Sequence, residues 1–161
     1  TDRGPKSEID SATGRVAKAL EGESLKVLKV GQGKVAEQKM GGFKADRWSG
    51  DAQLFWTGAK PRARLDLEVP VEVDGSYTVS AAFTVAKDYA IVNLLLDDEA
   101  LTNPIDLYNY PDVKTTGRLD FGARKLSAGK HTLTVEIISA NPAATKSYMV
   151  GLDYVLLTPA K

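Results

Sequence analysis

This 161-residue chain has no cysteine, so the residues best suited to chemistry are its one histidine and its 21 acidic residues. His131 follows a glycine turn, and no Ser-His-Asp or Cys-His arrangement can be assembled around it. The neighbours Asp97 and Asp98 fall in a predicted hairpin turn, where carboxylates are usually solvated. A glycosidase needs two carboxylates that face each other across a cleft, and the sequence selects no such pair. We therefore predict that the chain is not an enzyme.

Three other acidic residues stand out by their positions. Glu21 and Glu23 fall on one face of a predicted strand, because side chains alternate along strands. Asp153 lies within the otherwise apolar segment 150–157, which predicts a partner for its carboxylate. One interpretation has Glu21 and Glu23 solvated, with Asp153 bonded to a backbone amide or an arginine.

Charge and hydropathy exclude some functional classes. Lysine plus arginine equals aspartate plus glutamate, 21 against 21, and no long run of one sign favours nucleic acid. No apolar run approaches the roughly 20 residues of a membrane span. A hydrophobic content of 43% at this length predicts one domain with its own core. We interpret the start at Thr1 as a sign of a processed form or a fragment of a longer polypeptide.

The residues outside the turns fall into segments with the alternation and composition of strands. We expect strands at 20–30, 34–39, 51–57, 63–70, 76–85, 89–96, 104–108, 117–126, 130–138 and 148–157. Turn chemistry separates them, as in Asp74-Gly75 and Ala128-Gly129. Many short strands without a second helical pattern predict an all-β antiparallel β-sandwich. Residues 1–19 are predicted to form a linker or an N-terminal extension, and residues 20–161 the sandwich.

Two of these strands share one plan, a tight glycine turn followed by a period-two strand. In the strand after Gly129, the alternation turns Leu133, Val135 and Ile137 to one face. The strand after Asp74-Gly75 repeats the plan, so we expect both strands to run in the same direction. The loops that follow them, near residues 87–89 and 141–142, should therefore lie at one end. We predict the functional site at that end.

Short motifs also occur in a fixed order between residues 19 and 158. They are Glu21-Gly22-Glu23, Ser49-Gly50-Asp51, Phe55-Trp56, Arg64-Leu65-Asp66-Leu67, Asp74-Gly75-Ser76-Tyr77, Ala128-Gly129-Lys130-His131 and Leu152-Asp153-Tyr154-Val155. In order and spacing they resemble the jelly-roll, galactose-binding-like carbohydrate-binding modules of families 6 and 35. Gly22 stands where those modules have alanine, and Arg62-Ala63-Arg64 replaces their Gly-Asp pair.

This resemblance implies a non-catalytic module appended to a secreted bacterial enzyme that degrades polysaccharides. The expected ligand is a polysaccharide or an oligosaccharide. The expected partner is a parent glycoside hydrolase, or another polysaccharide-degrading domain, in the same chain. The expected location is secreted or on the cell surface.

The resemblance also implies a structural calcium ion that joins the first strand to the last. Carried over by position, its carboxylate ligands are Glu21, Glu23 and Asp153, with loop carbonyls completing the shell. Calcium prefers six to eight oxygen ligands, so carboxylates brought together there suit it.

The same modules bind sugar at the loop end, with one aromatic on a short strand, another on a later loop and an asparagine in the final loop. Sugar rings pack their C–H faces on aromatic rings, while their hydroxyls need polar partners. Trp56 and Asn141 are carried over by position, and Tyr110 is our choice for the second aromatic. The supporting candidates are Tyr89, Tyr108, Lys60, Lys87 and Asp88.

Several of these candidates have a packing alternative. Phe55 and Trp56 are adjacent, so one must face inward, and Trp56 is a candidate for the core. Asn141 precedes a proline and is equally well explained as a turn former. The aromatics interpreted as packing residues are Trp48, Tyr77 and Tyr154.

A second function class stays open on the sequence. A structural or protein-interaction sandwich of a large cell-surface protein would use the same exposed aromatics as interface anchors. The two classes differ in whether Trp56 and Tyr110 are exposed on one open cleft.

Overall fold

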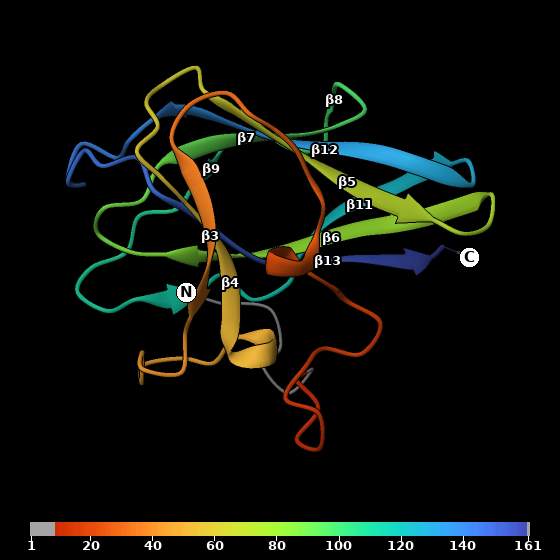
Figure 1. Cartoon of the computed structure of the whole chain (residues 1–161), viewed down its shortest axis with the longest axis horizontal. Coiled ribbons are helices and arrows are strands. Elements are labelled where there is room, and N and C mark those ends of the chain that lie inside the picture. Colours follow the sequence, from red (N-terminus) through yellow and green to blue (C-terminus); the bar gives the residue numbers. More distant parts are fainter. Residues whose placement is uncertain (1–8, 161) are drawn as a thin grey trace.

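The structure is a computed structural model that describes residues 9–160, and Figure 1 shows its chain path. Seven strands form one sheet in the order β10-β6-β13-β4-β3, with β1 paired to β13 and β11 to β6. Their bounds are β1 Leu20–Glu21, β3 Lys34–Lys39, β4 Ala52–Thr57, β6 Gly75–Val85, β10 Lys114–Thr115, β11 Leu119–Leu126 and β13 Val150–Pro159.

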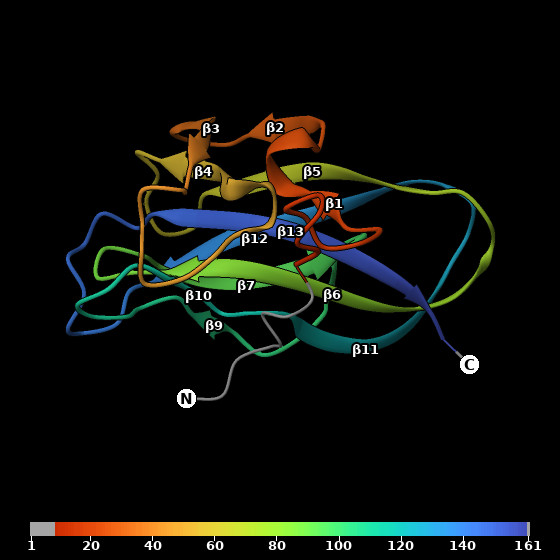
Figure 2. The ribbon, with the colours of Figure 1, turned by 90° about the horizontal axis from the view of Figure 1, so that it is seen from below.

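Six strands form the second sheet, in the order β2-β5-β12-β7-β8 with β9 paired to β7. Their bounds are β2 Val27–Val30, β5 Arg64–Val71, β7 Ile91–Leu96, β8 Glu99–Ala100, β9 Ile105–Asp106 and β12 Gly129–Ser139. All pairings in both sheets are antiparallel. In Figure 2, the long strands β6, β7, β12 and β13 run through the middle of the molecule. The predicted antiparallel β-sandwich is confirmed.

The core lies between the sheets and follows from the alternation of apolar side chains. In β12, Leu133, Val135 and Ile137 are at most 1% exposed, as predicted. Leu65 and Leu67 of β5 and Phe83 of β6 belong to the same cluster. Each such side chain contributes about 1.5–3 kcal/mol by leaving water, so the pattern of buried residues fixes which face of each strand turns inward.

The two predicted parallel-running strands, β6 and β12, do end at the same side of the sandwich. Residues 87–90 follow β6, and Thr145 N–H, in the loop after β12, donates to Lys87 O over 2.8 Å. Met149 N–H donates to Asp88 O over 3.1 Å. We call this side the loop end, and it lies at the left in Figure 1. The opposite side, where residues 72–74 join β5 to β6 and residues 127–128 join β11 to β12, is the turn end.

The predicted strand at 20–30 is interrupted. A 3-10 turn at Gly22–Ser24 separates β1 from β2. A Cβ atom at Gly22 would lie 2.2 Å from Leu152 O, so the chain approaches β13 too closely for any side chain. This close approach explains why glycine stands where the resembling modules have alanine.

The described part of the predicted linker packs on the sandwich as an ordered extension. Val16 is buried in a small cluster with Ala82, Tyr154 and Leu156. Gly50 N–H donates to Gly14 O over 2.6 Å, which holds the extension against the segment before β4. Residues 1–8 of the same prediction lie outside the described residues. The helices of residues 9–160 are short 3-10 turns, and none has the length and apolarity of a membrane span.

Candidate functional site

Backbone hydrogen bonds join three loops at the loop end. Beyond the bonds from Thr145 and Met149, Ala86 N–H donates to Leu107 O over 3.0 Å. Asn109 N–H donates to Ala86 O over 3.2 Å. The loops at residues 86–90, 107–112 and 141–149 therefore form one surface.

Asp106 organises the polar groups of this surface. Its Oδ2 accepts from Asn141 Nδ2 over 2.8 Å, and its Oδ1 accepts from Tyr108 N–H over 2.9 Å. Asn141 Oδ1 in turn accepts from Ala143 N–H over 2.9 Å. The prediction of Asn141 as a turn former is confirmed, and the same bonds hold its amide beside Tyr108. Sequence reasoning missed Asp106, although aspartate side chains often accept from the backbone N–H two residues further on.

Tyr110 is the exposed aromatic of the loop end. It is 68% exposed and precedes Pro111 in the loop between β9 and β10. Asn109 Nδ2 donates to Asp112 O over 2.7 Å, which closes the loop around Tyr110. Tyr108 is half-buried beside it. An exposed ring on a closed loop can stack on a flat apolar face at little entropic cost.

The prediction of Trp56 as an exposed platform is wrong. Its side chain is 1% exposed, and its Nε1 donates to Gln32 O over 2.8 Å. Alternation in β4 turns Leu54 and Trp56 into the core and leaves Phe55 on the other face. The packing alternative is the correct one for Trp56.

Tyr89 is also buried, so its supporting role as an exposed aromatic is wrong. It is 4% exposed, its hydroxyl accepts from Gln53 Nε2 over 3.1 Å, and its ring stacks on Phe55 with centroids 6.3 Å apart. Burial raises the pKa of the Tyr89 hydroxyl, with the bond from Gln53 opposing the shift.

The charged candidates lie at the surface. Lys87 is exposed and Asp88 half-buried, and both belong to the loop end through their backbone carbonyls. Lys60 is exposed on the loop after β4, and its N–H donates to Gln32 Oε1 over 2.9 Å. Its loop is thus held to the 31–33 turn, beside the edge of Trp56.

Ser49 connects two of the three predicted calcium ligands. Its hydroxyl donates to Glu21 Oε2 over 2.7 Å, and its N–H faces both oxygens of Asp153, at 3.1 and 3.3 Å. The same hydroxyl accepts from Val16 N–H over 2.9 Å. We call Glu21, Ser49 and Asp153 the acid cluster.

Burial perturbs the acids of this region. It is the largest of the causes that raise the pKa of Asp153 to about 8, and nearby carboxylates add to it. Burial also raises the pKa values of Glu21 and Glu23. A neighbouring cation, Arg15, partly offsets both shifts. Each raised pKa means that ionisation is costly here without a compensating charge.

The fit of these residues to calcium is partial. Glu21 Oε1 and Glu23 Oε1 are buried without a hydrogen-bond partner, as oxygens meant for a hard cation would be. Within residues 9–160, however, no group of three or more acidic or histidine side chains is placed to share one metal ion. Asp153 faces Ser49 instead, so the predicted set of three carboxylates is not assembled.

The packing interpretations of Trp48 and Tyr154 agree with the structure, whereas Tyr77 is half-buried. Trp48 is 1% exposed, and its Nε1 donates to Thr84 Oγ1 over 2.9 Å. His131 is buried, and its two ring nitrogens face Asp97 and the carbonyl of Ser127. The structure also shows a chain of bonded polar side chains that sequence reasoning missed, centred on Gln53.

Comparison with solved structures identifies the fold. A xanthan lyase from Paenibacillus matches with a TM-score of 0.74 and 14% identity, over 92% of this chain and 14% of the lyase. A family 35 carbohydrate-binding module from Clostridium thermocellum matches with a TM-score of 0.54 and 16% identity, over 88% of this chain and 98% of the module. A family 35 module from an environmental isolate matches with a TM-score of 0.52 and 14% identity, over 88% and 96%.

No family model and no curated protein matches the sequence itself. The chain spans a small part of the lyase and nearly the whole length of the two modules. It therefore has the fold of family 35 carbohydrate-binding modules, the fold that the sequence motifs predicted.

Proposed function

We propose that the chain is a non-catalytic module that binds a polysaccharide or an oligosaccharide at the loop end. The observation that carries the proposal is the 68% exposure of Tyr110 on a surface where three loops are bonded together. Tyr110 supplies the stacking face, and Tyr108, Asn141 and Asp88 lie on the same surface to meet hydroxyls.

The absence of a catalytic role is part of the same proposal. The carboxylates with raised pKa values, Glu21, Glu23 and Asp153, belong to the segments around Ser49 and not to the loop end. A glycosidase would need such a carboxylate beside the bound sugar. The module would act by holding a glycan-degrading domain of the same chain near its substrate, in a secreted or cell-surface protein.

Binding to a carbohydrate panel tests the proposal. The panel holds soluble xanthan, β-mannan, xylan, pectin and β-glucan, with xanthan included because of the Paenibacillus lyase. We expect wild type to bind one class and Tyr110→Ala to bind it about tenfold more weakly, because stacking is worth roughly 1 kcal/mol or more. Leu28→Ala is the matched control, since Leu28 is an exposed apolar residue of β2.

A structural or protein-interaction role is the second candidate. The burial of Trp56 and Tyr89 favours this role, because of these three aromatics Tyr110 is the exposed one. If folded wild type binds nothing in the panel, or if Tyr110→Ala binds as wild type does, the loop-end sugar site is overturned. A Tyr110-dependent partner domain would then support the second candidate.

We also propose a structural calcium ion held by Glu21 and Glu23, supported by their unpartnered buried oxygens. Bound calcium would neutralise both carboxylates and stabilise the folded state by mass action, by about 2.7 kcal/mol at a hundredfold excess over Kd. We expect the unfolding midpoint to rise with calcium relative to a chelator, and Glu23→Gln to reduce the rise. Equal midpoints in calcium and chelator would exclude the ion.

A further inference from the structure

A groove at the turn end has the lining of a ligand site and lies away from the loop end. Its first cavity has a volume of about 400 Å³ and opens where β5 of one sheet parts from β6 and β13 of the other. Tyr77 lies near the start of β6, eight residues from Val85 at its loop-end side. Eight strand residues span about 26 Å, so one sugar ring cannot touch both places.

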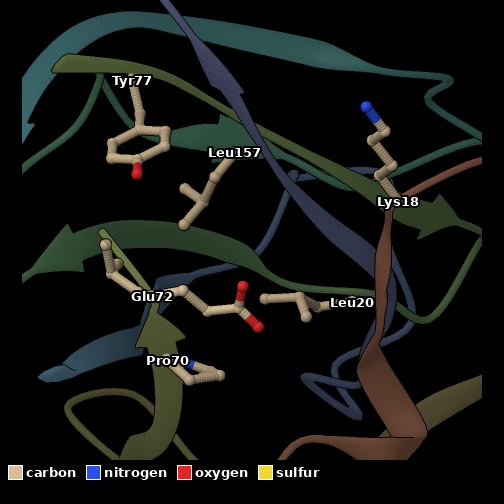
Figure 3. Close-up of a pocket in the computed structure, with 7 residues that line it drawn as sticks. Lys18, Leu20, Pro70, Glu72, Tyr77 and Leu157 are labelled. Atoms are coloured by element: carbon tan, nitrogen blue, oxygen red, sulfur yellow. The ribbon is translucent and has the colours of Figure 1, made fainter. Parts of the chain in front are cut away.

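The lining combines an apolar floor with two opposite charges. Tyr77, Leu157 and Leu20 present an aromatic and two aliphatic side chains to one space (Figure 3). Glu72 reaches the same space and extends its carboxylate toward Leu20 (Figure 3). Lys18 also lines it. A ring with an apolar face and a rim of hydroxyls matches this combination, because hydroxyls accept from an ammonium group and donate to a carboxylate.

Two features hold the lining in place before any ligand arrives. Tyr77 donates its hydroxyl to Val73 O over 2.5 Å, which fixes the ring against the connection from β5 to β6. Lys18 has a φ of 64°, in the left-handed region that residues other than glycine seldom occupy. Strain of this kind tends to persist at functional sites, and here it sets the direction in which the lysine leaves the backbone.

A second cavity of about 420 Å³ lies next to the first and shares Leu20 and Pro70 with it. The cationic residues that line the two cavities are Arg15, Lys18 and Lys26, and the acidic ones are Glu21, Glu68 and Glu72. In the first cavity Lys18 and Glu72 supply one charge of each sign, which leaves no net attraction for an acidic or a basic ligand. The balance therefore favours a neutral ligand rich in hydroxyls, and two adjacent cavities favour a chain of several units.

We propose that this turn-end groove is a second binding site, specific for a neutral oligosaccharide that stacks one ring on Tyr77 and bonds its hydroxyls to Lys18 and Glu72. The inference rests on the proposed function of the chain and adds a site that would let one module hold a glycan at two places. Two such sites raise the apparent affinity for a polymer well above that of either site alone.

The test separates the two sites by position. Backbone amide NMR spectra are recorded while mannohexaose, xylohexaose, cellohexaose or xanthan fragments are added to wild type and to Tyr110→Ala. In Tyr110→Ala we expect shifts confined to the groove, at amides such as those of Lys18, Leu20, Glu72 and Leu157. Tyr77→Ala should weaken this second binding about tenfold, and Tyr77→Phe should keep it because the ring remains.

Two further variants probe the polar contacts without endangering the fold. Lys18→Gly removes the ammonium group and at the same time relieves the left-handed backbone, so weaker binding with undiminished stability supports the assignment. Glu72→Gln keeps the shape of an exposed side chain and removes its charge. We expect each to weaken the groove site severalfold and to leave loop-end shifts unchanged.

The outcomes distinguish this inference from the proposed function. Shifts at the loop end alone overturn the groove site and leave the proposed function standing. Shifts at the groove alone support the groove site and overturn the loop-end site, while no shifts with any sugar overturn both. A wild-type dimer at NMR concentrations that Tyr77→Ala dissociates would assign the groove to a second copy of the chain and overturn the oligosaccharide proposal.

Discussion

Two buried polar clusters meet at consecutive residues, Trp48 and Ser49, and they are built in opposite ways. Trp48 begins a neutral chain in which it donates to Thr84, Thr84 donates to Gln53, and Gln53 donates to both Tyr89 and Gln38. Ser49 belongs to the acid cluster, where burial raises the pKa of a carboxylate and leaves a Glu21 oxygen without a partner. The neutral chain is satisfied by its own side chains, whereas the acid cluster needs a proton or a cation.

This difference decides which of the two clusters changes its contribution to stability with pH or with added cations. A neutral hydrogen-bonded chain contributes the same stability at every pH between the extremes, because none of its groups titrates there. Buried carboxylates change their net interaction whenever a proton or cation arrives. Two predictions test this contrast and a third concerns a titrating group outside both clusters, in order of decreasing effect.

The largest effect is expected from Gln53→Ala. Gln53 is 0% exposed, accepts from Thr84 and donates to Gln38 and Tyr89, so its loss leaves two buried groups and the half-buried Gln38 short of a partner. We expect the free energy of unfolding to fall by about 3 kcal/mol, equally at pH 5 and pH 8, as measured by urea denaturation. Gln38→Ala breaks one of these bonds and is the matched control. A loss at one pH only would contradict the neutral character of the chain.

The second prediction concerns the effect of Asp153 on stability in solutions without added cations. Its folded pKa of about 8 lies above the ordinary aspartate value of 3.8, so the folded state holds more protons between these values. The stability that Asp153 contributes is therefore complete below about pH 4 and is lost as pH rises toward 8.

Asp153→Asn should flatten this decline, because the amide can still accept from Ser49 and cannot ionise. Urea midpoints measured from pH 4 to pH 8 in chelator provide the test, with the exposed Asp112→Asn as the control. An unchanged slope in Asp153→Asn would show that the acid cluster is not the source of the pH dependence.

The smallest effect is expected from His131, which lies outside both clusters. Its Nδ1 lies 2.5 Å from Asp97 Oδ2 and its Nε2 lies 2.8 Å from Ser127 O, so both nitrogens face acceptors and the protonated ring fits best. The bond to Asp97 is the largest of the causes that raise the His131 pKa above 6.5. Its contribution is thus complete below pH 6.5 and is lost as pH rises through the raised pKa.

His131→Gln should lower the free energy of unfolding by about 1 kcal/mol at pH 6 and by less at pH 8. The decline due to Asp153 begins at lower pH, so the two effects can be separated. The NMR titration of the ring measures the pKa directly, because the chain has one histidine. Lys130→Gln, an exposed neighbour, is the control. A titration midpoint at or below 6.5 would contradict the assignment.

The fold was largely predictable because the local signals agree with one another. Turns such as Asp74-Gly75 and the alternation of Leu133, Val135 and Ile137 identify strands from residues close in sequence. The common direction of β6 and β12 followed from those signals, and the bond from Thr145 to Lys87 confirms it.

The site was less predictable because burial depends on contacts far along the chain. Nothing local decides whether Phe55 or Trp56 faces the core, since both are large aromatics on a strand. Tyr89 is buried by Gln53, which lies 36 positions earlier. The turn-end groove needs Lys18, from the region predicted to be a linker or extension, to meet β5 and β13.

Because β13 is central in its sheet, the folding of that sheet depends on a strand that is synthesised after the others. β13 lies between β6 and β4 and also pairs with β1, so it joins parts of the sheet that are otherwise separate. During synthesis the earlier strands leave the ribosome first, and domains fold as units once their segments are available. The seven-stranded sheet therefore closes only after Val150–Pro159 has emerged. A chain that lacks this strand is therefore expected to change from unfolded to folded when the strand is supplied as a separate peptide.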